Sequence, residues 1–236
     1  MQKGILYLIP VPLGDNPPLE VLPISVKKAI EDLNYFIVEN EKAGRKFIKN
    51  IYPGKSQSKL NLFPLNKFTE VADTIKYLDI CDEGISIGLL SDAGCPAIAD
   101  PGSEIVKLAH QKNIQVVPLV GPSSILLAMM SSGMNGQGFT FNGYLPIDKQ
   151  ERKTKIKLLE RISFEQHLSQ SFIETPYRNN QLLEELIKTL QPNTRICVAC
   201  DITLKTEYIF TTTAQDWSKI KVDLHKRPTI FIIQKD

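Results

Sequence analysis

The segment Leu90–Ser103 contains the residue types of a ligand-binding loop. Gly94 and Gly102 lack a Cβ, so a ligand or another stretch of backbone can approach them closely. Asp92 and Asp100 supply carboxylate acceptors, and two prolines restrict the backbone. An apolar run typical of a buried strand precedes the segment, and ligands of open α/β sheets bind beyond such strand ends. The pattern fits a binding loop and an ordinary strand-to-helix connection equally well.

Two more segments rich in Gly and Pro follow predicted strands, Pro10–Asn16 and Pro118–Ser124. Together the three loops predict a cleft lined mainly by backbone amides and small side chains. Neither a GxGxxG nor a GxxxxGK[ST] motif occurs in the chain, which disfavours a nicotinamide cofactor or a nucleoside triphosphate.

The cysteines and histidines do not predict a metal site. Cys197 and Cys200 lie in one predicted strand, where residues three apart point to opposite faces, and no second CxxC pair accompanies them. The histidines are isolated in the sequence and fit no metal-ligand spacing: His110, His167 and His225. We therefore predict core cysteines and no bound metal.

Charged residues of the second half offer two further candidate sites. Arg178 follows Glu174 by four residues and is predicted either to pair with it or to meet an anionic substrate. A predicted helix carries a run of cations: Lys149, Arg152, Lys153, Lys155, Lys157 and Arg161. Such a helix presents either a solvated face or a face that contacts phosphates.

The elements that would position these residues alternate between strands and helices. Strand-length apolar runs occur at 4–10, 35–38, 85–90 and 114–119, with amphipathic stretches at 22–33 and 103–111. Parallel strands need such crossovers, so the first half predicts a mostly parallel sheet. The second half predicts helices at 123–132, 150–162 and 178–190 and strands at 170–174, 195–200, 206–211 and 228–233. We predict an α/β fold of two domains, 1–118 with a mostly parallel sheet and 119–236 with a mixed sheet, with a cleft between them.

The composition is that of a globular protein. The 236 residues carry a formal net charge of +2 and 42% are hydrophobic, which excludes disorder driven by low hydrophobicity and high charge. Four cysteines are too few for a disulfide scaffold. No apolar run approaches the roughly 18 residues of a membrane helix, so we expect a cytoplasmic protein with no membrane partner. The near-neutral charge neither requires nor excludes a nucleic-acid partner.

Five segments in a fixed order together resemble the tetrapyrrole methylase superfamily. Within it they are most similar to the branch that methylates a cytidine ribose 2′-hydroxyl of small-subunit ribosomal RNA. These segments are Ser91–Pro96 with Asp100–Gly102, then Pro118–Ser124, Gly143–Pro146, Glu174–Arg178 and Asp201–Glu207.

The resemblance implies S-adenosylmethionine (SAM) bound between two α/β domains, within a homodimer. The matched cofactor-binding positions are Pro12, Asp92, Ala93, Gly94 and Ser123, with Leu145 and Pro146 closing the cleft from the second domain. Methyl transfer from a sulfonium needs no metal, only alignment of the reactants and exclusion of water.

The first 70 residues depart from the rRNA branch. Gly14–Pro18 replaces a Gly-Asn turn, and Glu39–Lys42 stands where the branch has Glu-Asp-Thr-Arg. A ribose hydroxyl is a weak nucleophile that benefits from a general base or a cation, so Glu39, Lys42 and Arg45 are the predicted catalytic residues. Substrate phosphates are predicted to meet Lys149, Arg152, Lys153 and Arg178.

The leading hypothesis is a SAM-dependent methyltransferase acting on a ribose 2′-hydroxyl of ribosomal RNA, free or in the small ribosomal subunit. One alternative is methylation of a tetrapyrrole or another small molecule, and a second is a SAM- or RNA-binding protein without catalysis. The lysines and arginines between 42 and 59 favour RNA. Binding without turnover would identify the non-catalytic alternative.

Overall fold

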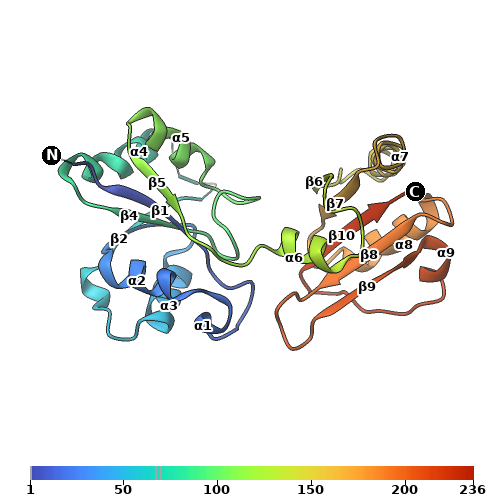
Figure 1. Ribbon diagram of the computed structural model, residues 1–236, viewed down its shortest axis with the longest axis horizontal. Helices are drawn as coiled ribbons and strands as arrows, with labels where there is room; N and C mark the ends of the chain where they lie inside the picture. The colour runs from blue at the N-terminus through green and yellow to red at the C-terminus, as the bar shows by residue number, and fades with distance from the viewer. Residues whose placement is uncertain (1, 67, 70) are drawn as a thin grey trace. The chain divides into compact units, whose positions relative to one another are not determined.

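The computed structural model describes residues 2–66, 68–69 and 71–236, and it divides into two compact units. The first unit comprises Met1–Ser123 and the second Ser124–Asp236. Each unit contains one five-stranded sheet with helices packed on it (Figure 1). The predicted α/β class is therefore confirmed.

The sheet of the first unit is parallel throughout, in the order β3-β2-β4-β1-β5. Its strands are β1 (Ile5–Ile9), β2 (Tyr35–Val38), β3 (Asn61–Pro64), β4 (Ile87–Leu90) and β5 (Gln115–Pro118). Leu6 of β1 lies opposite Ile87 of β4 on one side and Val116 of β5 on the other. The central strands are apolar and buried, as strands covered on both faces must be.

Helices cover both faces of this sheet (Figure 1). On one face lie α2 (Ile24–Asp32) and α3 (Glu41–Ile51), and on the other lie η2 (Ile75–Glu83) and α5 (Ser103–Gln111). The short elements are α1 (Pro18–Val21), η1 (Gln57–Lys59) and α4 (Val71–Thr74). Both cores are built from apolar side chains at helical spacing, such as Val26 and Ile30 of α2.

Among the elements of the first unit that the sequence did not predict are β3 and α3. The edge strand β3 is short, ends in Pro64 and has no fully buried residue, so it lacks the apolar run of a central strand. The helix α3 is rich in lysine and buries only Gly44, Ile48 and Ile51. Gly44 lies against Val38, where an added Cβ would come within 2.9 Å of a Val38 methyl carbon.

The sheet of the second unit is mixed, in the order β6-β7-β10-β8-β9. Only β6 and β7 are parallel, and the other neighbours are antiparallel, which confirms the predicted mixed sheet. The strands are β6 (Phe139–Tyr144), β7 (Ser169–Ile173), β8 (Arg195–Cys200), β9 (Tyr208–Thr213) and β10 (Thr229–Gln234). The helices are α6 (Ser124–Ser131), α7 (Lys149–Gln166), α8 (Asn179–Thr189) and α9 (Ala214–Trp217). The unpredicted strand is β6, a half-exposed edge strand.

The core of the second unit contains Trp217, which is 1% exposed and donates its indole N–H to the carbonyl oxygen of Ile196 at 2.9 Å. Cys197 and Cys200 are free and buried in β8, so both are core residues as predicted. Across the described residues, no helix combines the length and apolar character needed to span a bilayer.

Candidate functional site

Two loops at the carboxyl edge of the first unit's sheet are joined by backbone hydrogen bonds. Val11, just after β1, donates its N–H to the carbonyl oxygen of Gly94 at 2.9 Å. Gly94, just after β4, donates back to the carbonyl oxygen of Val11 at 3.2 Å. The resulting antiparallel bridge holds the predicted loops 10–16 and 90–103 side by side.

The third loop, after β5, packs on the other two. An added Cβ on Gly121 would lie 2.2 Å from the Cγ of Pro10, a separation that only glycine avoids. The Cys95 thiol lies 3.4 Å from the carbonyl oxygen of Pro122. All three predicted loops therefore meet at one edge, as the carboxyl ends of parallel strands require.

Three carboxylates lie close enough at this edge to affect one another. Burial raises the pKa of Glu39, and the negative charges of Asp92 and Asp100 raise it further. Burial also raises the pKa of Asp100, with the charge of Asp92 as the second cause. Partial desolvation by the surrounding loops raises the pKa of Asp92 although the residue is exposed overall, while the Asn40 backbone N–H acts in the opposite direction. The edge is therefore acidic and favours a cationic ligand.

Asp100→Asn should stabilise the first unit near neutral pH. A carboxyl whose pKa is raised on folding gives a stabilisation that is complete below the unfolded pKa and is lost as the pH rises through the folded value. The ionised Asp100 is therefore unfavourable at pH 7.5, and its removal should raise Tm by about 2 °C. The difference from wild type should vanish near pH 3. Glu83→Gln, on an exposed residue at the end of η2, is the control; a lowered Tm for Asp100→Asn at pH 7.5 would contradict the assignment.

The predicted catalytic residues occupy three different environments. Glu39 follows β2, and the nearby Asp92 backbone N–H opposes the rise of its pKa. Lys42 is exposed on α3. Arg45 instead donates to Glu41 Oε1 from Nε and Nη2, at 3.0 and 2.9 Å, and to the carbonyl oxygen of Gln57 at 2.9 Å. These contacts tie α3 to η1, and the catalytic role of Arg45 stays a prediction.

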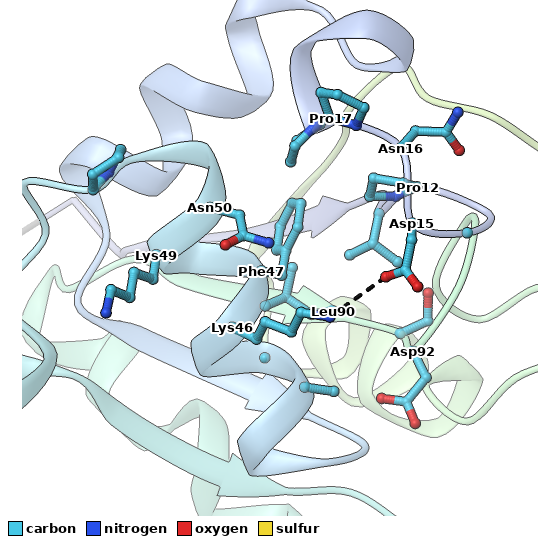
Figure 2. A pocket seen from close by; sticks show the side chains of 17 residues that line it. Pro12, Asp15, Asn16, Pro17, Lys46, Phe47, Lys49, Asn50, Leu90 and Asp92 are labelled. Atoms are coloured by element: carbon cyan, nitrogen blue, oxygen red, sulfur yellow. Dashed lines mark hydrogen bonds and ion pairs between the residues drawn. The ribbon is translucent and has the colours of Figure 1, made fainter.

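A cavity of about 680 Å³ opens between the loop after β1, the helix α3 and the end of β4 (Figure 2). Pro12 and Asp92, two predicted cofactor-binding residues, line it. None of the α3 residues that line the cavity was predicted, among them Lys46, Phe47 and Asn50. Lys46 and Phe47 lie four and three residues before Asn50, which places them on one helix face, but this pattern can be recognised only once α3 is known to be a helix.

The remaining predicted cofactor-binding residues differ in exposure. Asp92 and Ala93 are exposed, Gly94 is buried, and Ser123 is half-buried at the end of the first unit. In the second unit Leu145 is buried and Pro146 half-buried.

The structure corrects the role predicted for Arg152. Its side chain is buried and donates from Nε and Nη2 to both carboxylate oxygens of Glu185, at 2.5 and 2.8 Å. Its Nη1 donates to the carbonyl oxygens of Pro146 and Ile147, at 3.0 and 2.7 Å. Four of the five guanidinium N–H groups bond inside the second unit and hold the segment that contains Leu145. The side chain is also buried, so Arg152 is a structural residue and does not present its charge to a substrate phosphate.

The other predicted substrate-binding residues keep exposed charges. Lys149 and Lys153 are exposed on α7. Arg178 donates to Glu174 Oε1 at 2.7 Å, the pairing that was one of its two predicted alternatives. Glu174 is 6% exposed, so this contact compensates a buried carboxylate.

The sequence matches the family model of the Tetrapyrrole (Corrin/Porphyrin) Methylases over residues 6–217. The chain belongs to the tetrapyrrole methylase family. Ribosomal RNA small subunit methyltransferase I of Buchnera aphidicola subsp. Schizaphis graminum is 30% identical over 235 residues, which are 98% of this chain and 78% of that protein. The relative of the same name from Vibrio cholerae serotype O1 is 28% identical over 209 residues, 87% of this chain and 67% of that protein.

Solved structures share the tetrapyrrole methylase fold. The crystal structure of the methyltransferase CobJ is 16% identical in sequence, with a TM-score of 0.65 over 98% of this chain and 94% of that one. The predicted family, fold and methyltransferase class are therefore confirmed. As a member of the tetrapyrrole methylase family, the chain is a methyltransferase.

Proposed function

We propose that this methyltransferase uses SAM as its methyl donor and a ribose 2′-hydroxyl of small-subunit ribosomal RNA as the acceptor. The choice of SAM as donor is supported by the carboxyl edge of the first unit's sheet, where the loops are hydrogen-bonded to one another and three carboxylates lie close together. The acceptor is supported by the curated relatives, whose name specifies small-subunit ribosomal RNA. Such a substrate also places the protein in the cytoplasm.

The chemistry of the carboxyl edge fits SAM. SAM carries two positive charges, on its sulfonium and its α-ammonium group. The carboxylates of Glu39, Asp92 and Asp100 create a negative potential that attracts both groups. Gly94 has a φ of +74°, a left-handed backbone conformation in which any residue with a Cβ would be strained. Pro12, Asp92, Ala93, Gly94 and Ser123 would hold the cofactor from the first unit. SAM supplies an electrophilic methyl group.

Glu39 is the general base of the proposal. A base works best when its pKa lies near the working pH, and burial together with two neighbouring carboxylates moves the pKa of Glu39 upward. It would take the proton of the attacking hydroxyl. Lys42, exposed one residue beyond Glu41, is placed to interact with the RNA backbone instead.

Three further parts of the proposal rest on the family resemblance. Leu145 and Pro146 would complete the cofactor site, and the protein would act as a homodimer. Lys149 and Lys153 would bind substrate phosphates, since both are exposed on α7.

Asp92→Asn should weaken SAM binding by about 10- to 100-fold, because a hydrogen bond to a charged group contributes about 1.5–3 kcal/mol. Titration calorimetry of SAM into both proteins at pH 7.5 measures the effect. Wild-type affinity should itself fall as the pH is lowered through the raised pKa values of the edge carboxyls, since the protonated groups no longer attract a cation. Glu83→Gln should bind SAM like the wild type, and silence of the wild-type titration at high SAM concentration would reject the donor.

The acceptor is tested with SAM carrying a labelled methyl group. The purified protein should transfer label into small ribosomal subunits, or their RNA, prepared from cells that lack the modification. Label in a tetrapyrrole fraction but not in RNA would favour the small-molecule alternative. SAM binding without transfer to either would identify a non-catalytic protein.

A further inference from the structure

The cavity beside α3 extends well beyond the predicted cofactor-binding residues. It lies within the first unit and shares only Pro12 and Asp92 with the predicted cofactor-binding residues. Its volume of about 680 Å³ falls in the range of small-molecule sites. The walls contributed by α3 therefore lie outside the proposed methyl-donor site.

The walls have the chemistry of a nucleotide site. Phe47 projects from α3 toward the loop that carries Pro12 and Pro17, and these rings present flat apolar surfaces (Figure 2). A base can pack against such surfaces, as bases do in single-stranded RNA recognition. Asn50 lies beside Phe47, and its side-chain amide makes no hydrogen bond with any described residue, so it can donate to and accept from a base edge.

The rim carries a cation that can exchange partners. Lys46 Nζ lies 3.4 Å from Asp15 Oδ1, and the two side chains are 69% and 99% exposed (Figure 2). An ion pair this exposed contributes little, so a phosphate can displace Asp15 at low cost. The rim also carries the carboxylates of Asp15 and Asp92, which disfavour a ligand with many carboxylates but tolerate one phosphate bound to Lys46.

We infer that this cavity receives the nucleotide of the acceptor RNA that bears the reacting hydroxyl, with Lys46 binding its phosphate and Asn50 its base. The inference rests on the proposed function and deepens it. Asp92 lines the cavity and its charge also acts on Glu39, so a nucleotide held here lies beside the loop that carries Asp92 and next to the acidic edge that contains the proposed base. Lys46 and Asn50 are positioning residues in this scheme.

Lys46→Gln should raise KM for RNA about tenfold and leave the Kd for SAM within twofold of the wild-type value. Because one phosphate contact on a single strand is lost, the slope of log KM against log salt concentration should shrink by about 0.7. Asn50→Leu should lower kcat/KM by about tenfold at every salt concentration, since it removes an uncharged contact. Asp15→Asn should lower KM for RNA at low salt, because it frees Lys46.

Lys107→Gln is the matched control. Lys107 lies on α5, is 65% exposed in its side chain and pairs with Glu104 at 3.5 Å, as Lys46 pairs with Asp15. It belongs to the opposite face of the sheet and should leave KM and the salt slope unchanged.

Two results would overturn the inference. If the wild type methylates RNA and Lys46→Gln behaves like Lys107→Gln, the nucleotide binds elsewhere while the proposed function stands. If Lys46→Gln weakens SAM binding as strongly as RNA binding, the cavity belongs to the methyl donor. A wild type that binds SAM but labels no RNA defeats the proposed acceptor itself, which is a separate result.

Discussion

Glu39→Gln is expected to lower kcat for RNA methylation by about 10²- to 10⁴-fold, the usual contribution of a positioned general base. Glutamine keeps the size of the side chain and an acceptor oxygen near the Asp92 backbone N–H, so the loop after β4 should remain in place. What is lost is the ability to take a proton. The Kd for SAM should change much less than kcat, by an amount that reflects only the lost negative charge.

The pH profile separates a base from a structural residue at this position. Wild-type kcat should fall as the pH is lowered through the pKa of Glu39, which burial and two neighbouring carboxylates raise above its ordinary value. Glu39→Gln should lack this acidic limb. Glu41→Gln, two residues along the chain, removes a carboxylate that pairs with Arg45 and should retain wild-type kcat. Full activity of Glu39→Gln would exclude Glu39 as the base.

Arg152→Ala is expected to destabilise the second unit by about 3–5 kcal/mol, the cost of breaking a buried ion pair on one side. The substitution strips the Glu185 carboxylate of two hydrogen bonds, and Glu185 is only 14% exposed in its side chain. It also releases the carbonyl oxygens of Pro146 and Ile147. The segment that carries Leu145 should become mobile before the unit unfolds.

Trp217 allows the second unit to be monitored alone. It is the single tryptophan of the chain and is buried in the core of that unit, so its fluorescence in urea reports the unfolding of that unit. Arg161→Ala is the control. It removes an exposed arginine of the same helix, whose Nε lies 3.9 Å from Glu165 Oε1, and should lower the free energy of unfolding by less than about 1 kcal/mol. The double variant Arg152→Met/Glu185→Leu should recover most of the lost free energy of unfolding, since no buried charge is then left unpaired. A midpoint for Arg152→Ala equal to that of Arg161→Ala would contradict the structural role.

The fold was largely predictable because burial leaves a signal in the sequence. The apolar runs of β1, β2, β4 and β5 were recognised, and their spacing predicted a parallel sheet. Three of the elements that escaped prediction lie where burial is incomplete: β3 and β6 are half-exposed edge strands, and α3 buries only Gly44, Ile48 and Ile51. Short edge elements are specified by the neighbours they pair with, and those neighbours are known only from the tertiary structure.

The candidate site was predictable to the level of its loops but not of its side chains. The positions of Gly and Pro predicted the three loops, since these residues favour turns and disfavour the continuation of a strand. The role of Arg152 could not be read from its neighbours, because Glu185 lies on a different helix and the basic composition of α7 suggested a phosphate-binding face. Likewise, the mutual effect of Glu39 and Asp100 depends on strand order, which brings β2 beside β4.

The position of β1 in the sheet has a consequence for how the protein is made. β1 pairs only with β4 and β5, and Leu6 lies opposite Ile87 and Val116. At about 5–20 residues per second, a ribosome adds Ile87 about 4–16 s after Leu6, and Val116 later still. During that interval the apolar strand Ile5–Ile9 has no partner, whereas β9 follows its antiparallel neighbour β8 within a few residues. The sheet that carries the site therefore closes only after β5 is synthesised, and β1 is the segment that a nascent-chain chaperone has most reason to cover.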